Sequence, residues 1–283
     1  MGDFKMPYPI REKRELAPNT VMLQVYAPLA TVKMRPGQFV MVRVTPNGER
    51  IPLSISGWDR DKGTLRIIVQ AVGRTSTELI NLRVGDSLED VVGPLGQPSH
   101  TDKCGTCVLI GGGYGTGAII PIAQELVEKG NRVIGIIGAR TKGLVLMEDE
   151  LRNICHQVEV STNDGSHGVK GLVTDVLAGI LKQEPVHMVT AIGPVPMMKA
   201  VSNLTRPFNI KTFVSLNAIM VDGTGMCGAC RVEVGGVTRF ACIEGPDFDG
   251  HQVNFDELVY RQRMYVPYEK KAMELCGCKG GGQ

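Results

Sequence analysis

The 283-residue sequence lacks a long apolar run, an excess of one charge, and a high aromatic content. Its most apolar stretch, residues 108–126, is interrupted by glycines and a proline, so it falls short of the roughly 20 apolar residues of a spanning helix. Lys and Arg number 31 against 29 Asp and Glu, which creates no field that would attract nucleic acid or an anionic membrane. We therefore expect a globular protein with no membrane span and no nucleic-acid partner.

Residues 1–16 are charged and interrupted by prolines, and so lack the apolar core of a signal peptide. This predicts a cytoplasmic location, where eight cysteines are more typical of metal or redox groups than of disulfides. The sequence contains no C-x₂-C-x₂-C-x₃-C run, the pattern that binds [4Fe-4S] clusters. Cys104, Cys107 and Cys155 are interpreted as incidental thiols, and no role is assigned to Cys276 and Cys278 in the C-terminal tail.

Residues 1–100 are expected to form an antiparallel β-barrel. Short alternating or β-branched runs between Thr20 and Val92 are separated by Pro-Gly, Asn-Gly and Lys-Gly turns, a pattern typical of such barrels or of sandwiches. The run Thr75-Ser-Thr-Glu78 has capping-box spacing and predicts a short helix whose first N–H groups point outward. A helix start at this place would bind an anion.

Residues 101–215 show the rhythm of strand, glycine loop and helix, which predicts a doubly wound parallel sheet of five strands. The loop of residues 111–117 has the spacing of a dinucleotide-binding turn, although a tight strand-to-helix turn is the simpler interpretation of glycines alone. After the second strand stands Arg140, where NAD-binding units usually carry an acidic residue, so the sequence does not choose between NADH and NADPH. His167 is interpreted as a loop residue and not as a base, and no catalytic proton-transfer residue is predicted.

Residues 216–283 contain the sharpest signal, a C-x₂-C pair at Cys227 and Cys230 followed by Cys242. Glycines surround these thiols, and glycine-rich loops let backbone N–H groups turn toward the sulfurs of an iron–sulfur cluster. A structural zinc site is the alternative, but zinc ribbons usually supply two paired knuckles. The residues therefore favour a [2Fe-2S] cluster that is one ligand short.

The order of these three regions resembles the ferredoxin reductase-like electron-transfer subunits over nearly the whole chain. The segments MVDGTGMCGACRV and ACIEGPDFDGH are most similar to the small subunit of NADH-dependent reduced ferredoxin:NADP⁺ oxidoreductases, also called the sulfide dehydrogenase beta subunit, with GARTKGLVLMEDEL and AIGPVPMMKAV in support. The electron-transfer subunit of dihydroorotate dehydrogenase is a more distant likeness, and its cluster loop has four cysteines. Asp222 stands where the first of these would be, so the resemblance makes Asp222 the fourth ligand beside Cys227, Cys230 and Cys242, unless it merely caps the glycine turn.

The resemblance also implies the cofactors and their contacts. FAD would lie against the barrel on Arg50, Pro52, Leu53, Ser54, Ile68, Val69, Gln70, Gly73, Thr75 and Ser76, with Ile51 where such motifs usually have arginine. NAD(H), or NADP(H), would bind Gly112, Gly113, Gly115, Thr116, Gly117, Arg140, Thr141, Asp164, Gly193, Pro194 and Met197.

The expected activity is electron transfer between NAD(H), FAD and a [2Fe-2S] cluster in an electron-bifurcating complex. Because the sequence has no [4Fe-4S] motif, ferredoxin would exchange electrons with a larger partner. The resemblance implies that this partner is a glutamate-synthase-like iron–sulfur flavoprotein, in a heterodimer. Two alternatives stay open: electron transfer for an NAD-dependent dihydroorotate dehydrogenase, and a zinc-stabilised assembly module without catalysis.

Overall fold

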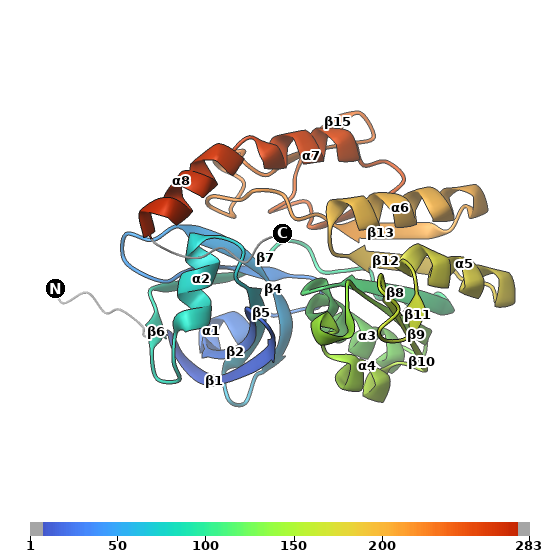
Figure 1. Cartoon of the computed structure of the whole chain (residues 1–283), viewed down its shortest axis with the longest axis horizontal. Helices are drawn as coiled ribbons and strands as arrows, with labels where there is room; N and C mark the ends of the chain where they lie inside the picture. Colours follow the sequence, from blue (N-terminus) through green and yellow to red (C-terminus); the bar gives the residue numbers. More distant parts are fainter. Residues whose placement is uncertain (1–7, 277–283) are drawn as a thin grey trace.

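The computed structural model describes residues 8–276, and side chains as far as residue 274. Within this part the chain forms two seven-stranded sheets, a hairpin and a C-terminal helical segment. The two sheets lie side by side, and the C-terminal helical segment runs across the top of the view in Figure 1. The ends of the first and third expected regions, including Cys278, lie outside the described residues. No helix among the described residues is both long and apolar enough to span a bilayer.

The first sheet is the expected antiparallel barrel, nearly closed, with strand order β6-β1-β2-β5-β4-β3-β7. Side chains alternate along each strand, so that Val40 and Val42 of β3 fill the barrel core while Phe39 and Met41 point out of it. The elements are β1 (Tyr8–Ala17), β2 (Thr20–Tyr26), α1 (Pro28–Thr31), β3 (Phe39–Arg43), β4 (Arg50–Asp59), β5 (Thr64–Gln70), α2 (Arg74–Asn81), β6 (Ser87–Leu88) and β7 (Asp90–Leu95).

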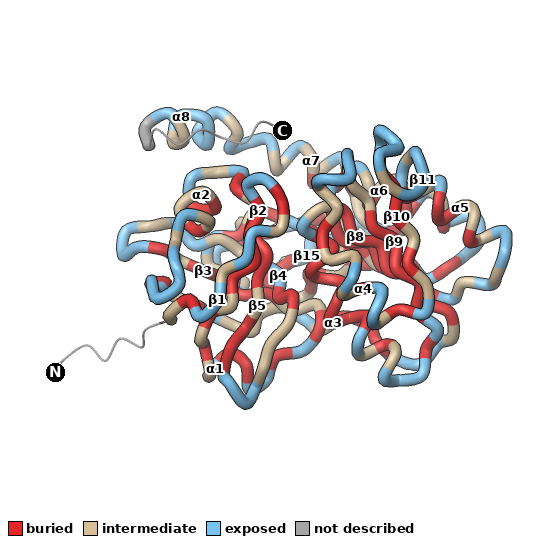
Figure 2. Tube along the Cα trace, turned by 60° about the horizontal axis from the view of Figure 1, so that its bottom comes forward, coloured by how far each residue is buried: buried red, intermediate tan, exposed pale blue. Residues whose placement is uncertain are grey.

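The second sheet is parallel over its five expected strands, and its order β10-β9-β8-β12-β13 is that of a doubly wound fold. Its central strands are the most deeply buried part of the chain (Figure 2). Its elements are β8 (Thr106–Gly112), α3 (Gly115–Glu128), β9 (Arg132–Ala139), η1 (Lys142–Leu144), α4 (Glu148–Ile154), β10 (Gln157–Thr162), β11 (Val169–Lys170), α5 (Val173–Gln183), β12 (Met188–Ile192), α6 (Val195–Thr205), η2 (Arg206–Phe208) and β13 (Lys211–Ser215).

The third region is joined to the second sheet, which the sequence did not predict. Strand β16 (Asp247–Asp249) pairs antiparallel with β13, as the edge strand of the parallel sheet. A hairpin of β14 (Arg231–Val234) and β15 (Val237–Phe240) precedes it, and helices α7 (Phe255–Arg263) and α8 (Val266–Cys276) follow where only a charged tail was expected. Helix α8 contacts α2 and so returns the chain to the barrel (Figure 1).

Candidate functional site

Strand β4 carries Arg50, Pro52, Leu53 and Ser54 of the residues predicted to bind FAD, and its side chains alternate between the barrel core and the outer face. Ile51, Leu53 and Ile55 pack against the barrel core, so the side chains of Pro52 and Ser54 lie on the outer face. The side chain of Leu53 therefore points into the barrel, and only its backbone is left for a ligand on the outer face. At the start of the strand, the Arg50 guanidinium lies 2.7 Å from the Asp90 carboxylate.

The N-cap of the barrel helix α2 lies two residues before the predicted cap, Thr75. The Ser76 hydroxyl oxygen accepts hydrogen bonds of 2.9 Å from the backbone N–H groups of Val72 and Gly73, which makes Gly73 the N-cap. Glu78 pairs with Arg74 at 2.9 Å and does not reach back to Thr75, so the predicted capping box of Thr75 and Glu78 was wrong. Arg74, Thr75 and Ser76 form the first turn of α2, and helix geometry leaves their N–H groups without intrahelical acceptors.

The three predicted residues of β5 point in different directions. Val69 is buried in the barrel core, Gln70 is half-buried, and Ile68 packs outside the barrel in a small apolar cluster with Leu146. Ile68 contacts the nucleotide loop, because a Cβ atom built on Gly117 would lie 2.4 Å from the Ile68 Cδ1. The glycine at position 117 thus allows the first turn of α3 to lie directly on the barrel.

The glycine loop after β8 meets the loop after β12, so the predicted nucleotide residues of the two loops lie side by side. A Cβ on Gly112 would lie 2.7 Å from the Met197 Sδ, and one on Gly193 would lie 3.1 Å from the Gly112 Cα. Gly113 has a φ of +56° and faces open space. Beside it, the Thr116 hydroxyl is buried and has no hydrogen-bond partner among the described residues. An open glycine and an orphaned hydroxyl at a helix start fit a bound pyrophosphate better than a simple turn.

The remaining predicted nucleotide residues lie at the carboxyl ends of β9 and β10. Arg140 and Thr141 are exposed, and Asp164 accepts hydrogen bonds from the Ser166 N–H and hydroxyl at 3.0 and 2.6 Å. These bonds, the hydroxyl first, hold the pKa of Asp164 below its usual value. The Ser166 hydroxyl in turn accepts the Lys142 N–H at 2.7 Å, so the two strand ends are tied together.

Three of the predicted cluster ligands lie on the loop before β14 and Cys242 follows β15, and the four are not arranged as one cage. The Sγ atoms of Cys230 and Cys242 are 3.2 Å apart and buried, whereas Cys227 is exposed. Burial and then the Cys230 thiol raise the pKa of Cys242 to about 12, so a bound metal would have to displace its proton. Within residues 8–274, no group of three or more His, Cys, Asp or Glu side chains is placed to hold a metal ion.

Asp222 caps the cluster loop. Its carboxylate accepts the Thr224 N–H at 2.9 Å through one oxygen and the Cys227 N–H at 3.0 Å through the other. These backbone bonds, the one from Thr224 first, lower the pKa of Asp222 and keep it anionic. The capping role that the sequence left open is therefore present. Each carboxylate oxygen keeps a second lone pair, so the cap does not prevent metal ligation.

The glycines of this loop fit an iron–sulfur cluster. Gly223, Gly225 and Gly228 all have positive φ values, which L side chains rarely adopt, and the loop turns the Ala229 N–H to 3.5 Å from the Cys227 Sγ. The Cys242 N–H lies at the same distance from the Cys230 Sγ. Backbone N–H groups directed at cysteine sulfurs are how such loops stabilise a cluster.

The cluster loop also rests on the barrel, through residues that the sequence reasoning missed. A Cβ on Gly223 would lie 2.7 Å from the Met41 Cγ and 2.9 Å from the Leu95 Cδ1. Met41 is the register partner of Pro52, so it lies on the same outer face, one strand away. The unbroken apolar run of residues 39–42 was the available signal, because a strand buried on both faces loses its polar alternation.

Known families match both ends of the chain. Residues 7–100 match the oxidoreductase FAD-binding domain, and residues 217–254, which include all four predicted ligands, match the iron–sulfur cluster binding domain of dihydroorotate dehydrogenase B. A homolog of the dihydroorotate dehydrogenase B (NAD⁺) electron transfer subunit from Thermotoga maritima is 43% identical over 265 residues, which cover 94% of each chain. The chain belongs to this family of electron-transfer subunits.

Two further relatives extend the comparison. The electron transfer subunit of dihydroorotate dehydrogenase B from Bacillus caldolyticus is 32% identical, over 86% of this chain and 96% of its own. A chain of a solved NADH-dependent reduced ferredoxin–NADP oxidoreductase, studied for flavin-based electron bifurcation, is 41% identical with a TM-score of 0.91, over 98% of this chain and 99% of its own. The expected fold and the expected class, a flavin- and iron–sulfur-dependent oxidoreductase subunit, are confirmed, and a non-catalytic zinc module is not supported.

Proposed function

We propose that the chain carries electrons between NAD(H), FAD and a [2Fe-2S] cluster, as a subunit of an electron-bifurcating NADH-dependent reduced ferredoxin:NADP⁺ oxidoreductase. Its partner is a larger, glutamate-synthase-like iron–sulfur flavoprotein that exchanges electrons with ferredoxin, and the two work in the cytoplasm as a heterodimer. The solved relative with this activity aligns with the chain almost end to end.

The position of β4 in the barrel carries the proposal. This strand holds Pro52 and Ser54 on its outer face and lies between β5 and β3 in the sheet. On the β5 side, Gly117 of the nucleotide loop touches Ile68; on the β3 side, Gly223 of the cluster loop touches Met41. The FAD-binding strand is therefore flanked by the nucleotide loop and the cluster loop, the order that electron transfer from NADH to a cluster requires.

The protein's part in this reaction is to bind and orient. The first turn of α2, with Thr75 and Ser76, would bind the FAD pyrophosphate, and Gly113 with Thr116 would bind that of the nicotinamide nucleotide. Asp222, Cys227, Cys230 and Cys242 would hold the cluster. The residues named would hold an FAD that supplies hydride chemistry toward NAD(H) and one-electron chemistry toward the cluster. Hydride exchange between cofactors depends on their alignment, so no side chain has to act as an acid or base.

The surface around the cluster loop supports a partner subunit. Val221, Met226 and Ile243 are apolar and exposed, Met226 to 88% of its surface, and each stands next in sequence to a predicted cluster ligand. Clustered apolar side chains on a surface mark protein contacts more often than chance exposure does. A subunit that covers this surface would come close enough to the cluster to exchange electrons with it.

Electron transfer for a dihydroorotate-oxidising partner is the second candidate. The names of the relatives from Thermotoga maritima and Bacillus caldolyticus favour it. Asp222 weighs against it, because the family resemblance places a cysteine at that position in the dihydroorotate enzymes.

Purification of the complex from native cells tests both functions. We expect a larger iron–sulfur flavoprotein to co-purify, flavin and [2Fe-2S] absorption from this chain, and NADP⁺ reduction that needs both NADH and reduced ferredoxin. Dihydroorotate-dependent NAD⁺ reduction would establish the second candidate instead. A colourless complex without NADH oxidation would refute both.

A further inference from the structure

A two-pronged ion pair crosses from the barrel to the nucleotide-binding domain. Arg66 of β5 donates from Nη2 to Glu150 Oε1 at 2.6 Å and from Nη1 to Glu150 Oε2 at 3.0 Å. Both side chains are mostly covered, with 22% and 29% of their surfaces exposed. Paired hydrogen bonds of this kind define a direction as well as a distance, because the guanidinium and carboxylate planes must align.

The guanidinium of Arg66 is itself fixed to the FAD-binding strand. Its Nη2 and Nε donate to the Ser56 carbonyl at 2.6 and 3.3 Å, and the Ser56 hydroxyl donates back to the Arg66 carbonyl at 3.0 Å. Ser56 stands two residues after Ser54 on β4. Arg66 is thus fixed on β4, the strand proposed to face the flavin, while it holds Glu150 of the nucleotide-binding domain. This arrangement resists rotation of that domain relative to the barrel.

The segment that leads to Glu150 packs on the same side of the barrel. Leu146, only 4% exposed, lies with Ile68 and Met22 in a small apolar cluster between the two domains. This segment begins immediately after Arg140 and Thr141, the exposed residues predicted to meet the nucleotide. A segment of about ten residues, from Thr141 to Glu150, thus connects the carboxyl end of β9 to the ion pair with Arg66 on the barrel.

We propose that Arg66 and Glu150 form a positioning pair that sets the orientation of the nucleotide-binding domain on the barrel, and with it the approach of the nicotinamide to the flavin. The inference rests on the proposed reaction between NADH and FAD. A lysine at position 66 would keep the charge but lose the paired geometry, so charge alone does not fulfil this role.

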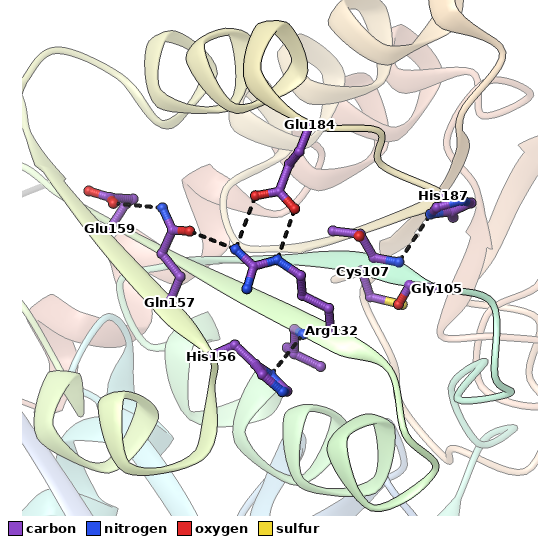
Figure 3. Close-up of polar contacts among 10 residues, drawn as sticks. Gly105, Cys107, Arg132, His156, Gln157, Glu159, Glu184 and His187 are labelled. Carbon is purple, nitrogen blue, oxygen red and sulfur yellow. Dashed lines mark hydrogen bonds and ion pairs between the residues drawn. The ribbon is translucent and has the colours of Figure 1, made fainter.

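The test is a double-mutant cycle in the purified full complex, with Arg66→Met, Glu150→Gln and both together. A matched control is the ion pair of Arg132 and Glu184, which is also two-pronged, through Nε at 2.8 Å and Nη2 at 3.1 Å, but lies wholly within the nucleotide-binding domain (Figure 3). The corresponding control variants are Arg132→Met and Glu184→Gln. The rate of flavin reduction by saturating NADH is measured in a single turnover, together with FAD content and hydrogen exchange in α4.

We expect Arg66→Met to slow flavin reduction about tenfold at saturating NADH, with FAD content unchanged, since small misalignments of reacting groups are costly. Glu150→Gln should slow it as well, and the double variant should be no slower than Arg66→Met, because the two residues act as one unit. Arg66→Lys should lie between Arg66→Met and the unaltered protein. The control variants should stay within about twofold of the unaltered protein, which separates positioning from general stability.

Additive effects, or equal losses in the control pair, would overturn the proposal. If the unaltered complex did not reduce its flavin with NADH, the proposed function would fail, and hydrogen exchange would still decide the pairing. Faster exchange in α4 of Arg66→Met and Glu150→Gln, without further increase in the double variant, supports the pair. Unchanged exchange in all three refutes it.

Discussion

The contact between Gly117 and Ile68 gives the most direct test of how the nucleotide loop lies on the barrel. A Cβ atom at position 117 would lie 2.4 Å from the Ile68 Cδ1, 3.1 Å from its Cγ1 and 3.2 Å from the Ser56 Cβ. Gly117 lies in the first turn of α3 with ordinary helical geometry, so alanine would meet no backbone strain there. The substitution Gly117→Ala therefore perturbs packing alone.

Carbon atoms in contact prefer about 3.5 to 4.0 Å, so the alanine methyl must separate α3 from β5 by about 1 Å unless Ile68 yields. Ile68 is only 7% exposed and is enclosed by Leu146 and Met22, which leaves it little room. Overpacking of this kind costs about 1–3 kcal/mol of stability. Because a misplacement of 1 Å can cost up to about 100-fold in rate, we expect flavin reduction by NADH to slow by about 10- to 100-fold.

Stopped-flow flavin bleaching with saturating NADH measures this rate, and the visible spectrum reports FAD content. The second-site change Ile68→Val removes Cδ1, the atom that clashes, so Gly117→Ala with Ile68→Val should recover most of the lost rate. Gly179→Ala in helix α5 is the matched control, since a Cβ there meets nothing within 4 Å and alanine should stabilise the helix by about 0.5–1 kcal/mol. A Gly117→Ala variant with normal rate and stability would refute the close packing.

Three other predictions concern the C-terminal region. Asp222→Asn keeps an acceptor for the turn but loses the anionic ligand, so it should lose cluster absorption as Asp222→Ala does; an unchanged spectrum would leave Asp222 as a cap only. Gly223→Ala, at φ +76° and against Met41, should lower the cluster content and reduce the stability by about 2 kcal/mol or more. Its control is Gly236→Ala, at a similar φ of +75° but with nothing within 4 Å of the added Cβ, which should cost less stability. Burial lowers the pKa of His251 from 6.5, so at mildly acidic pH the unfolded chain binds a proton there that the folded chain does not. The stability is therefore full above pH 6.5 and falls as the pH drops below 6.5. His251→Gln should reduce this fall, as measured by thermal melts at a series of pH values.

Much of the fold could be predicted because its signals are local. Turn residues between β-branched runs indicated the barrel, and the five parallel strands follow apolar runs bounded by glycine loops, such as Val108–Ile110 within β8. The N-cap of α2 is Gly73 and not Thr75, as the capping-box pattern had indicated, because the Ser76 hydroxyl accepts the N–H groups of Val72 and Gly73. Strand β16 was missed, since its short segment Asp247–Asp249 pairs only through tertiary contact with β13.

The candidate site was predicted in its parts but not in its connections. Glycine spacing marked both loops, because close backbone approach demands glycine at positions such as 112 and 223. What each glycine approaches could not be predicted: Gly117 meets Ile68, and Gly223 meets Met41, residues more than 40 positions away. The pairing of Arg66 with Glu150 could not be predicted: Glu150 lies in the segment GARTKGLVLMEDEL, but nothing in the sequence indicates that Arg66 contacts it.

The observed cap at Asp222 is compatible with the ligand role that the sequence also left open. Its two oxygens hold the N–H groups of Thr224 and Cys227, so the carboxylate shapes the loop that presents the Cys227 thiol. A cysteine at this position would supply a thiolate ligand but only weak acceptors for those N–H groups. A loop that depends on the carboxylate for its shape would therefore not regain its structure in Asp222→Cys, even if four thiolates then bound the cluster. Cluster content equal to that of the unaltered protein, together with a spectrum typical of four cysteines, would show that ligand charge alone determines the site.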